Sequence, residues 1–269
     1  MIPKVKVGGL DVSRLVIGTN PFFGFSHFSA ARSQWLVRYF TDERIEEIVE
    51  CCVVAGMNAT VSQAKPQYRK IMDKVEKNTG VHIVWFATPG GFPWDSWKDD
   101  IKQCADLGAE FVLPHQSFTD NALHSGNETI ERYEEIAAYI RELGMRPGLS
   151  THRPEAVVVA DKAGYDVETY IQVYNSAGFL CQVETDWVGK VIREAKKPVL
   201  CIKPLGSGRV MPPTALPFVF ESIKPNDIVA IGMLSPEEVA EDVKITEQVL
   251  AGLQANVELQ ETRSKSALK

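Results

Sequence analysis

The chain has 269 residues, of which 45% are hydrophobic and 24% are charged, and its formal net charge is −6. A chain of this length and composition can bury a full core, which excludes the intrinsically disordered, collagen-like and disulfide-scaffold classes. The sequence contains no basic block, which argues against a nucleic-acid or anionic-membrane surface, because such surfaces depend on clustered Lys and Arg. We therefore expect one globular protein whose partners are small molecules.

The cysteines and the amino-terminal residues bear on the compartment. The five cysteines are odd in number and show neither a CxxC pair nor a zinc-ligand spacing, so they are expected to be reduced thiols. Residues 1–7 contain no apolar stretch of signal-peptide length, and no later run approaches about 20 apolar residues. These features predict a cytoplasmic protein.

Short apolar runs alternate with amphipathic helical patterns along the chain. In chain order, strands are predicted at residues 15–19, 59–62, 81–87, 111–114, 146–150, 169–174, 198–202 and 227–231. Helical spacing is clear after a cap at Thr41 and again after Ser235. Eight strand–helix units in about 250 residues predict a single TIM-type (β/α)8 barrel, whereas a doubly wound sheet would normally show a GxGxxG turn. We assign residues 1–256 to the barrel and residues 257–269 to a polar tail.

The predicted fold locates the chemistry, because barrel enzymes build their sites at the carboxyl ends of the strands. Four of the five histidines fall at these ends or in the loops that follow: His27, His115, His124 and His152. No Asp or Glu stands at a predicted strand end, which disfavours divalent-metal and paired-carboxylate chemistry. No metal site is therefore predicted.

Residues 4–19, KVKVGGLDVSRLVIGT, resemble the amino-terminal signature of the aldo/keto reductases, in which a hairpin closes the barrel floor. Residues 111–115, 171–175, 203–206 and 231–238 are similar to later strands of that family, and residues 148–152 resemble a branch that often carries iron–sulfur clusters. The extra cysteines of that branch are absent, so no cluster is expected. The resemblance implies an oxidoreductase that uses NADP or NAD.

The resemblance also implies where such a cofactor would bind. It assigns the nicotinamide carboxamide to Ser150 and Gln172. It assigns the phosphates to the helix start at Ser235 and to the loop residues Leu205, Gly206, Ser207, Gly208 and Arg209. A glycine-rich loop and an uncapped helix amino terminus favour anions, although Glu237 and Glu238 in the first helical turn oppose a phosphate there.

The catalytic tetrad of the family is largely replaced. Carbonyl reduction needs a general acid, which the family supplies as a Tyr tuned by Lys and Asp. Here Val61, Pro66 and Pro89 occupy the positions that the resemblance gives to Asp, Tyr and Lys, and only His115 matches. Tyr68 could replace the missing acid if its loop or helix shifts, and Lys65 could replace the missing Lys.

Two further features complete the predicted site. Lys203 ends an apolar strand and would point into the barrel mouth if Val199 and Cys201 face inward; burial would then lower its pKa and suit it to Schiff-base or base chemistry. The aromatic segment 20–28 predicts a lid or pocket wall, with a subunit contact in a homo-oligomer as the alternative. The predicted substrate pocket comprises Asn20, Phe22, Phe23, His27, Gln63, Gln116, His152 and Tyr174.

Three functions remain open for a small polar carbonyl or sugar-like substrate. The first is a divergent NADP- or NAD-dependent oxidoreductase, in which His115 acts on the carbonyl and Tyr68 or Lys65 partly restores the acid system. The second is a lyase or isomerase that uses His115, His152 and Lys203, with or without a metal. The third is a binding protein that retains the enzyme fold without catalysis.

Overall fold

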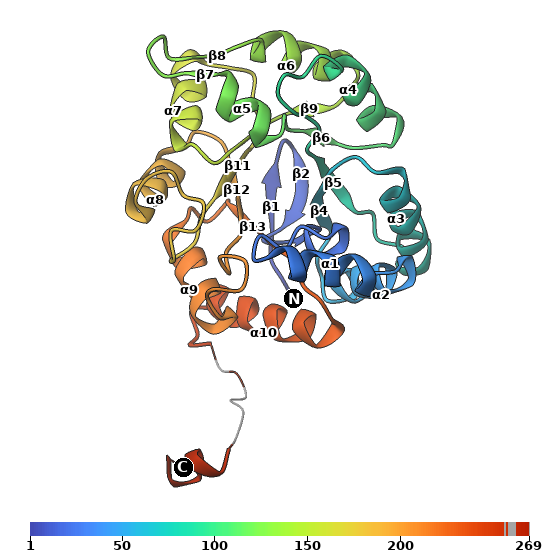
Figure 1. The fold of residues 1–269 in the computed structure, drawn as a ribbon, viewed down its shortest axis with the longest axis vertical. Helices are drawn as coiled ribbons and strands as arrows, with labels where there is room; N and C mark the ends of the chain where they lie inside the picture. The colour runs from blue at the N-terminus through green and yellow to red at the C-terminus, as the bar shows by residue number, and fades with distance from the viewer. Residues whose placement is uncertain (256, 258–261, 269) are drawn as a thin grey trace.

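The computed structural model describes residues 1–255, 257 and 262–268. Parallel strands form a closed barrel inside a ring of helices, which confirms the predicted (β/α)8 architecture (Figure 1). In sheet order the strands are β3 (Leu15–Gly18), β4 (Ala59–Ser62), β5 (Val84–Ala87), β6 (Phe111–Val112), β9 (Arg146–Pro147) with β10 (Leu149–Thr151), β11 (Tyr170–Val173), β12 (Val199–Ile202) and β13 (Ile228–Ile231). The last strand, β13, pairs with β3 and closes the ring.

Helices connect the strands and cover the outside of the barrel. They are α1 (Ala30–Tyr39), α2 (Asp42–Val54), α3 (Pro66–Thr79), α4 (Trp97–Asp106), α5 (Gln116–Ala122), α6 (Tyr133–Glu142), α7 (Pro154–Ala163), α8 (Thr185–Glu194), α9 (Pro212–Ser222) and α10 (Pro236–Leu250), with short 3₁₀ turns η1 (Pro21–Phe23) and η2 (Arg263–Leu268). Thr41 caps α2 as predicted, its hydroxyl accepting from the Arg44 N–H. The boundary predicted at residue 256, and residues 258–261 and 269 of the predicted tail, lie outside the described residues.

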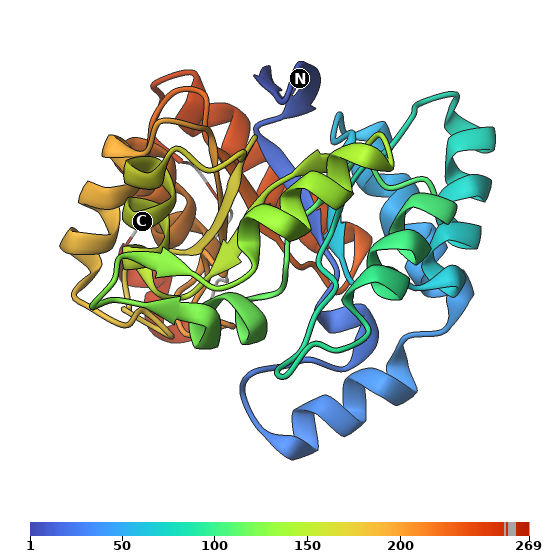
Figure 2. The same cartoon turned by 90° about the horizontal axis from the view of Figure 1, so that it is seen from above.

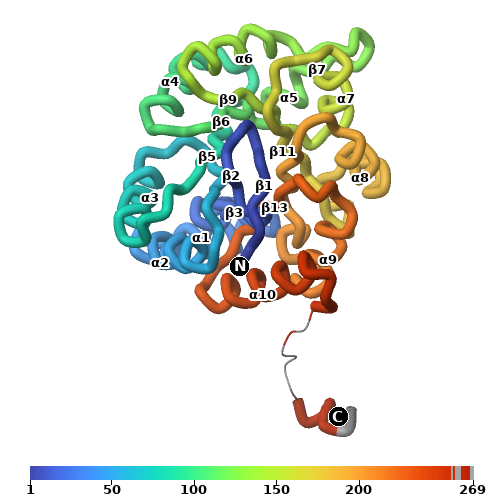
Figure 3. Tube along the Cα trace, turned by 180° about the vertical axis from the view of Figure 1, so that it is seen from behind, coloured from blue at the N-terminus to red at the C-terminus, as the bar shows by residue number. Residues whose placement is uncertain are grey.

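A hairpin of β1 (Lys4–Val7) and β2 (Leu10–Ser13) closes one end of the barrel. Its apolar residues Val7 and Val12 pack inside the barrel with residues such as Phe86 and Phe111. The Gly8 carbonyl accepts a hydrogen bond of 2.6 Å from Arg146, at the start of β9, which places the hairpin at the amino-terminal ends of the strands. Figures 2 and 3 show the hairpin at one end and Figure 2 shows α1 at the other. The open mouth therefore lies at the carboxyl ends, where a barrel enzyme carries its site.

The strand predicted at residues 146–150 is interrupted at Gly148. A Cβ at this position would lie 2.6 Å from Leu113 Cδ2 and 2.8 Å from the Thr169 carbonyl oxygen. Only a residue without a side chain fits there, so glycine is required at the point between β9 and β10.

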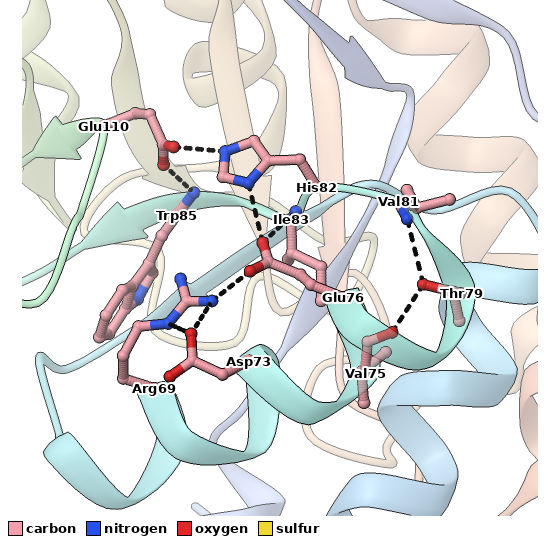
Figure 4. A network of polar contacts seen from close by, with 10 residues as sticks. All are labelled: Arg69, Asp73, Val75, Glu76, Thr79, Val81, His82, Ile83, Trp85 and Glu110. Atoms are coloured by element: carbon pink, nitrogen blue, oxygen red, sulfur yellow. Dashed lines mark hydrogen bonds and ion pairs between the residues drawn. The ribbon is translucent and has the colours of Figure 1, made fainter.

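The strand predicted from residue 81 begins only at residue 84, because a polar network occupies the residues before it (Figure 4). His82 bridges two carboxylates: Nδ1 lies 2.8 Å from Glu76 and Nε2 lies 2.6 Å from Glu110. The same two carboxylates accept the backbone N–H groups of Ile83 and Trp85. The Ile83 amide is therefore bound to a helix side chain rather than to a neighbouring strand. This network stabilises the floor of the barrel.

Other features bear on the predicted compartment. All five cysteines are free thiols in the structure. Among the helices of the described residues, none is both long enough and apolar enough to span a bilayer.

A second hairpin, β7 (Leu123–His124) with β8 (Thr129–Ile130), was not predicted and carries His124.

Candidate functional site

A cavity of about 730 Å³ opens at the barrel mouth. Residues at or just beyond the carboxyl ends of seven strands line it: Thr19, Ser62, Thr88, His115, Ser150, Lys203 and Gly232. Ile171 of β11 also reaches it. The site is thus assembled from the whole ring of strands.

Many of the predicted site residues line this cavity and several do not. Those that line it are Asn20, Phe23, His27, Gln63, His115, Gln116, Ser150, His152, Lys203, Leu205, Ser207 and Gly208. Those that are not part of its lining are Phe22, Tyr68, Gln172, Tyr174, Gly206, Arg209 and Ser235. His124 is likewise outside the lining; it is exposed on β7 and lies 3.4 Å from Glu131.

The aromatic segment after the first strand forms one wall of the mouth. It is partly helical, with η1 at residues 21–23 and with α1 starting after the Ser29 cap. Phe23, Phe25 and Phe28 line the cavity, whereas Phe22 is buried in the core. Because Phe25 and Phe28 are also exposed to solvent, the segment covers a site that remains open.

Tyr68 lies in the core rather than in the mouth. Its ring is fully buried and its hydroxyl lies 2.8 Å from the Thr60 hydroxyl. The neighbours of Thr60 in β4, Ala59 and Val61, face the barrel interior, so Thr60 and Tyr68 lie on the helix side of that strand. Burial raises the pKa of Tyr68. The loop or helix that carries Tyr68 is therefore not displaced toward the mouth, and the Tyr68 hydroxyl does not reach the cavity where a substrate carbonyl would lie.

Lys203 reaches the mouth by a different route from the predicted one. Val199 and Cys201 pack against the helices, whereas Leu200 and Ile202 face the interior, so the alternation on which the prediction relied is wrong. Lys203 follows the strand with a φ of +60°, in the left-handed region that side chains with a Cβ seldom adopt. This conformation ends the alternation and leaves both Ile202 and Lys203 on the cavity wall.

The hydrogen bonds of His115 determine its tautomer. His115 caps α5, and its Nδ1 accepts the Ser117 N–H at 3.2 Å and lies 2.8 Å from the Ser117 hydroxyl. A nitrogen that accepts cannot carry the proton, so the neutral ring is protonated at Nε2. Burial, and then the charge of Lys203, lower the pKa of His115. At neutral pH this side chain is therefore an uncharged hydrogen-bond donor.

Asp120 of α5, which sequence analysis missed, holds the loop that carries His152. Its carboxylate oxygens each lie 3.2 Å from the His152 N–H, and one of them accepts the Thr151 hydroxyl. Burial raises the pKa of Asp120 despite these bonds. The residue gave no sequence signal, because it stands one helical turn beyond a strand end.

The ionisable residues of the cavity lining are mostly basic in type: His27, Arg32, His115, His152 and Lys203. Burial, followed by neighbouring cations, lowers the pKa of His27 to about 4 and that of His152 to about 3, and burial lowers the pKa of Lys203 to about 8. Within the described part of the chain, Lys203 has no carboxylate partner, and Glu238 is the one acidic residue of the lining. Each lowered pKa reflects the free-energy cost of holding a positive charge in this partly buried cavity. A bound anion would offset that cost.

The amino terminus of α10 is capped, contrary to the sequence prediction. Ser235 accepts the Glu238 N–H at 3.3 Å, and the Glu238 carboxylate accepts the Leu234 N–H at 2.7 Å. The arrangement resembles a capping box, except that Glu238 accepts from the amide of Leu234, the residue before the cap, instead of from that of Ser235. It occupies amides that a dinucleotide phosphate would need and places a negative charge beside them.

Of the residues that the resemblance assigns to a nicotinamide cofactor, Ser150, Leu205, Ser207 and Gly208 lie on the cavity wall, and Ser150 is the one of the two carboxamide residues that does. Gln172 pairs in register with Cys201, whose side chain faces the helices, and the Gln172 side chain is fully buried on that same side. Its Oε1 has no hydrogen-bond partner there, and Ile171 takes the cavity-facing position. With Glu238 closing the helix terminus, the set does not fit the cofactor as assigned. The described residues also contain no group of three or more potential metal ligands.

Comparisons with known proteins address the fold. No family model and no curated protein matches the sequence. One similar solved structure is described as a "putative aldo-keto reductase" from Pseudomonas aeruginosa. It has 20% identity and a TM-score of 0.66, and the alignment covers 92% of this chain and 94% of that chain. Another is described as a "putative 2,5-diketo-D-gluconic acid reductase B". It has 11% identity and a TM-score of 0.59, and the alignment covers 98% of this chain and 95% of that chain.

A third similar structure is an aldo-keto reductase from a Medee basin deep-sea metagenome library, with 11% identity and a TM-score of 0.55. The alignment covers 96% of this chain and 97% of that chain. These likenesses confirm that the chain has the barrel fold of the aldo-keto reductases along nearly its whole length.

Proposed function

We propose that the protein is an enzyme that binds a small, negatively charged carbonyl compound in the barrel mouth. The observation that carries this proposal is the lining: Arg32 and Lys203 share one cavity with the uncharged rings of His27, His115 and His152, and among the described lining residues only Glu238 is acidic. Uncompensated basic groups in a partly buried site attract anions, because burial weakens the screening by water.

Each part of such a substrate has a partner in the site. The ammonium group of Lys203 attracts the carboxylate or phosphate, and the Nε2–H of His115 donates to the carbonyl oxygen. Phe23 and its aromatic neighbours cover the bound molecule and reduce its contact with water. The structurally similar 2,5-diketo-D-gluconic acid reductase B is named for a substrate that combines a carboxylate with carbonyl groups, which supports this substrate class.

Nicotinamide-dependent reduction is the second candidate function, favoured by the fold shared with the aldo-keto reductases and by Ser150 on the cavity wall. A bound nicotinamide would supply or accept hydride. No reduction step is assigned to this chain, because Val61 and Pro89 stand at the positions that the resemblance gives to Asp and Lys and Tyr68 is withdrawn into the core.

Binding measurements test the proposal. Pyruvate and its neutral analogue pyruvamide are compared by isothermal titration calorimetry at pH 7, alongside dihydroxyacetone phosphate and dihydroxyacetone. We expect each anion to bind at least about ten-fold more tightly than its neutral analogue, which corresponds to about 1.4 kcal/mol. Equal affinities, or no binding of either anion, would refute it. Parallel titration with NADPH and NADH tests the second candidate, which fails if neither binds.

A further inference from the structure

We propose that Lys203 is a covalent catalytic residue, whose amine forms an imine with the carbonyl carbon of the substrate. This inference rests on the proposed function, because it requires a carbonyl compound in the same cavity. It goes further by assigning a reaction: imine formation allows the carbon–carbon or carbon–hydrogen bond next to the former carbonyl to be broken without hydride transfer.

The position of Lys203 is the first observation. Its side chain and that of His115 line the same cavity from β12 and β6, which are three places apart in the sheet order. A carbonyl compound held between them can meet an amine on one side and a hydrogen-bond donor on the other. His152, which follows β10, lies between these two strands in the ring and lines the same cavity.

The backbone at Lys203 is the second observation. A φ of +60° is disfavoured for any residue with a Cβ, and glycine would adopt it without strain. The Lys203 carbonyl accepts the Gly206 N–H at 2.9 Å, so a tight turn holds this conformation. Strained backbone of this kind clusters at functional sites, where the structure holds a side chain in a required place.

The chemical state of the amine is the third observation. The side chain is partly buried, and within the described residues its ammonium group has no hydrogen-bond or ion-pair partner. Burial lowers its pKa to about 8, so about a tenth of the amine is uncharged at pH 7. The uncharged amine is the nucleophile, and no other group has to remove its proton before attack.

The step balances with water as the product. The Nζ lone pair attacks the carbonyl carbon, and the carbonyl oxygen takes up a proton to give a carbinolamine. That oxygen, with its hydrogen and one further proton, leaves as water while the nitrogen forms the C=N bond and loses its hydrogens. No oxidant or reductant is consumed. His115 lines the same cavity, and its Nε2–H donates a hydrogen bond to that oxygen while negative charge develops on it during the attack.

A simpler role for Lys203 would be to attract the anion by charge alone. Two substitutions separate the roles, because Lys203→Arg keeps the positive charge but lacks a nucleophilic amine, and Lys203→Met removes both. Lys65→Met is the matched control: Lys65 Nζ lies 4.8 Å from the ring centroid of Phe23, so this amine is close to the cavity without lining it.

The experiment is reductive trapping of the full chain with pyruvate, and separately with dihydroxyacetone phosphate, in the presence of sodium cyanoborohydride. Intact mass and peptide mapping identify the product, and calorimetry measures binding of the same probes. The native protein and Lys65→Met should each gain one adduct, whose mass is that of the probe less one oxygen atom, on the peptide containing Lys203. Lys203→Arg should still bind the probe and form no adduct there, while its thermal unfolding confirms that it is folded.

Two results would overturn the inference. If the probes bind but no adduct forms on Lys203, or if lysines are modified without preference, Lys203 does not form the imine, and the proposed function stands. If neither probe binds the native protein, the proposed function and the imine fail together.

Discussion

Asp242→Asn is expected to make the protein more resistant to unfolding at alkaline pH. Asp242 lies on α10 with only 2% of its surface exposed, and its Oδ1 has no hydrogen-bond partner among the described residues. Burial, and then the charges of Glu238 and Glu241, raise the pKa of this carboxyl from 3.8 to about 7. The thiol of Cys52 on α2 adds no positive charge to offset them.

The magnitude follows from linkage. Because the folded-state pKa is raised, the protonated carboxyl contributes stability that is fully present below the unfolded pKa of 3.8 and is lost as the pH rises to about 7. At about 1.4 kcal/mol per pH unit, the span corresponds to about 4 kcal/mol in total, of which about 3 kcal/mol is lost between pH 5 and pH 8. Asparagine cannot ionise and avoids this loss, although its own unpaired amide costs about 1 kcal/mol at both pH values.

Urea unfolding at pH 5 and pH 8 measures the effect. The free energy of unfolding of Asp242→Asn, taken relative to the native protein, should increase by about 3 kcal/mol between pH 5 and pH 8. Asp99→Asn, an exposed substitution on α4 whose charge does not act on Asp242, should show almost no such increase. The reasoning is wrong if the free energies of unfolding of the two variants change alike between pH 5 and pH 8, since burial would then not determine the pKa of the Asp242 carboxyl.

Three other predictions concern the mouth and the floor. Affinity for pyruvate should fall at least three-fold as pH rises through about 8, because Lys203 loses its proton, and calorimetry on Lys203→Met should show no such step. Glu238→Gln removes the acidic residue of the lining and should raise pyruvate affinity by about two- to five-fold; a weaker complex would contradict the electrostatic account. His82→Ala breaks the bridge between Glu76 and Glu110 and should lower the free energy of unfolding by about 1 kcal/mol in urea while leaving pyruvate affinity unchanged.

The barrel could be predicted because its signal is repeated. Each strand is a short apolar run, and the differences from the predicted strands are local: one predicted strand is interrupted at Gly148, and another begins late because the carboxylate of Glu76 binds the Ile83 amide. The resemblance gave the floor hairpin, whose apolar residues fill the barrel interior as that likeness implied. The strands and the hairpin could be predicted because they depend on patterns in the local sequence, which can be read from one chain alone.

The facing of individual side chains could not be predicted in the same way. A shift of one residue in a strand exchanges the interior and helix sides, so Gln172 and Ile171 exchange the roles expected of them. Lys203 reached the predicted place although the assumed alternation was inverted, because a left-handed residue breaks the two-residue period. Asp120 and the capping bond of Glu238 are tertiary contacts that no spacing displays.

By the resemblance, the chain has the barrel of the aldo/keto reductases but not their catalytic tetrad. The energetics of buried ion pairs explain why the charged positions of the tetrad are replaced together. By the resemblance, Val61 and Pro89 stand where a buried Asp and Lys would face each other. Losing one member of a buried ion pair leaves an uncompensated charge, whereas losing both can cost little. Both positions are uncharged here, so no charge of that pair is left without its partner. The charges of the present mouth instead belong to Arg32, to Lys203 and to Glu238, whose carboxylate is bound to the Leu234 amide. Among the described residues, Lys203 has no carboxylate partner in the mouth, and an unpaired, partly buried lysine favours an anionic ligand.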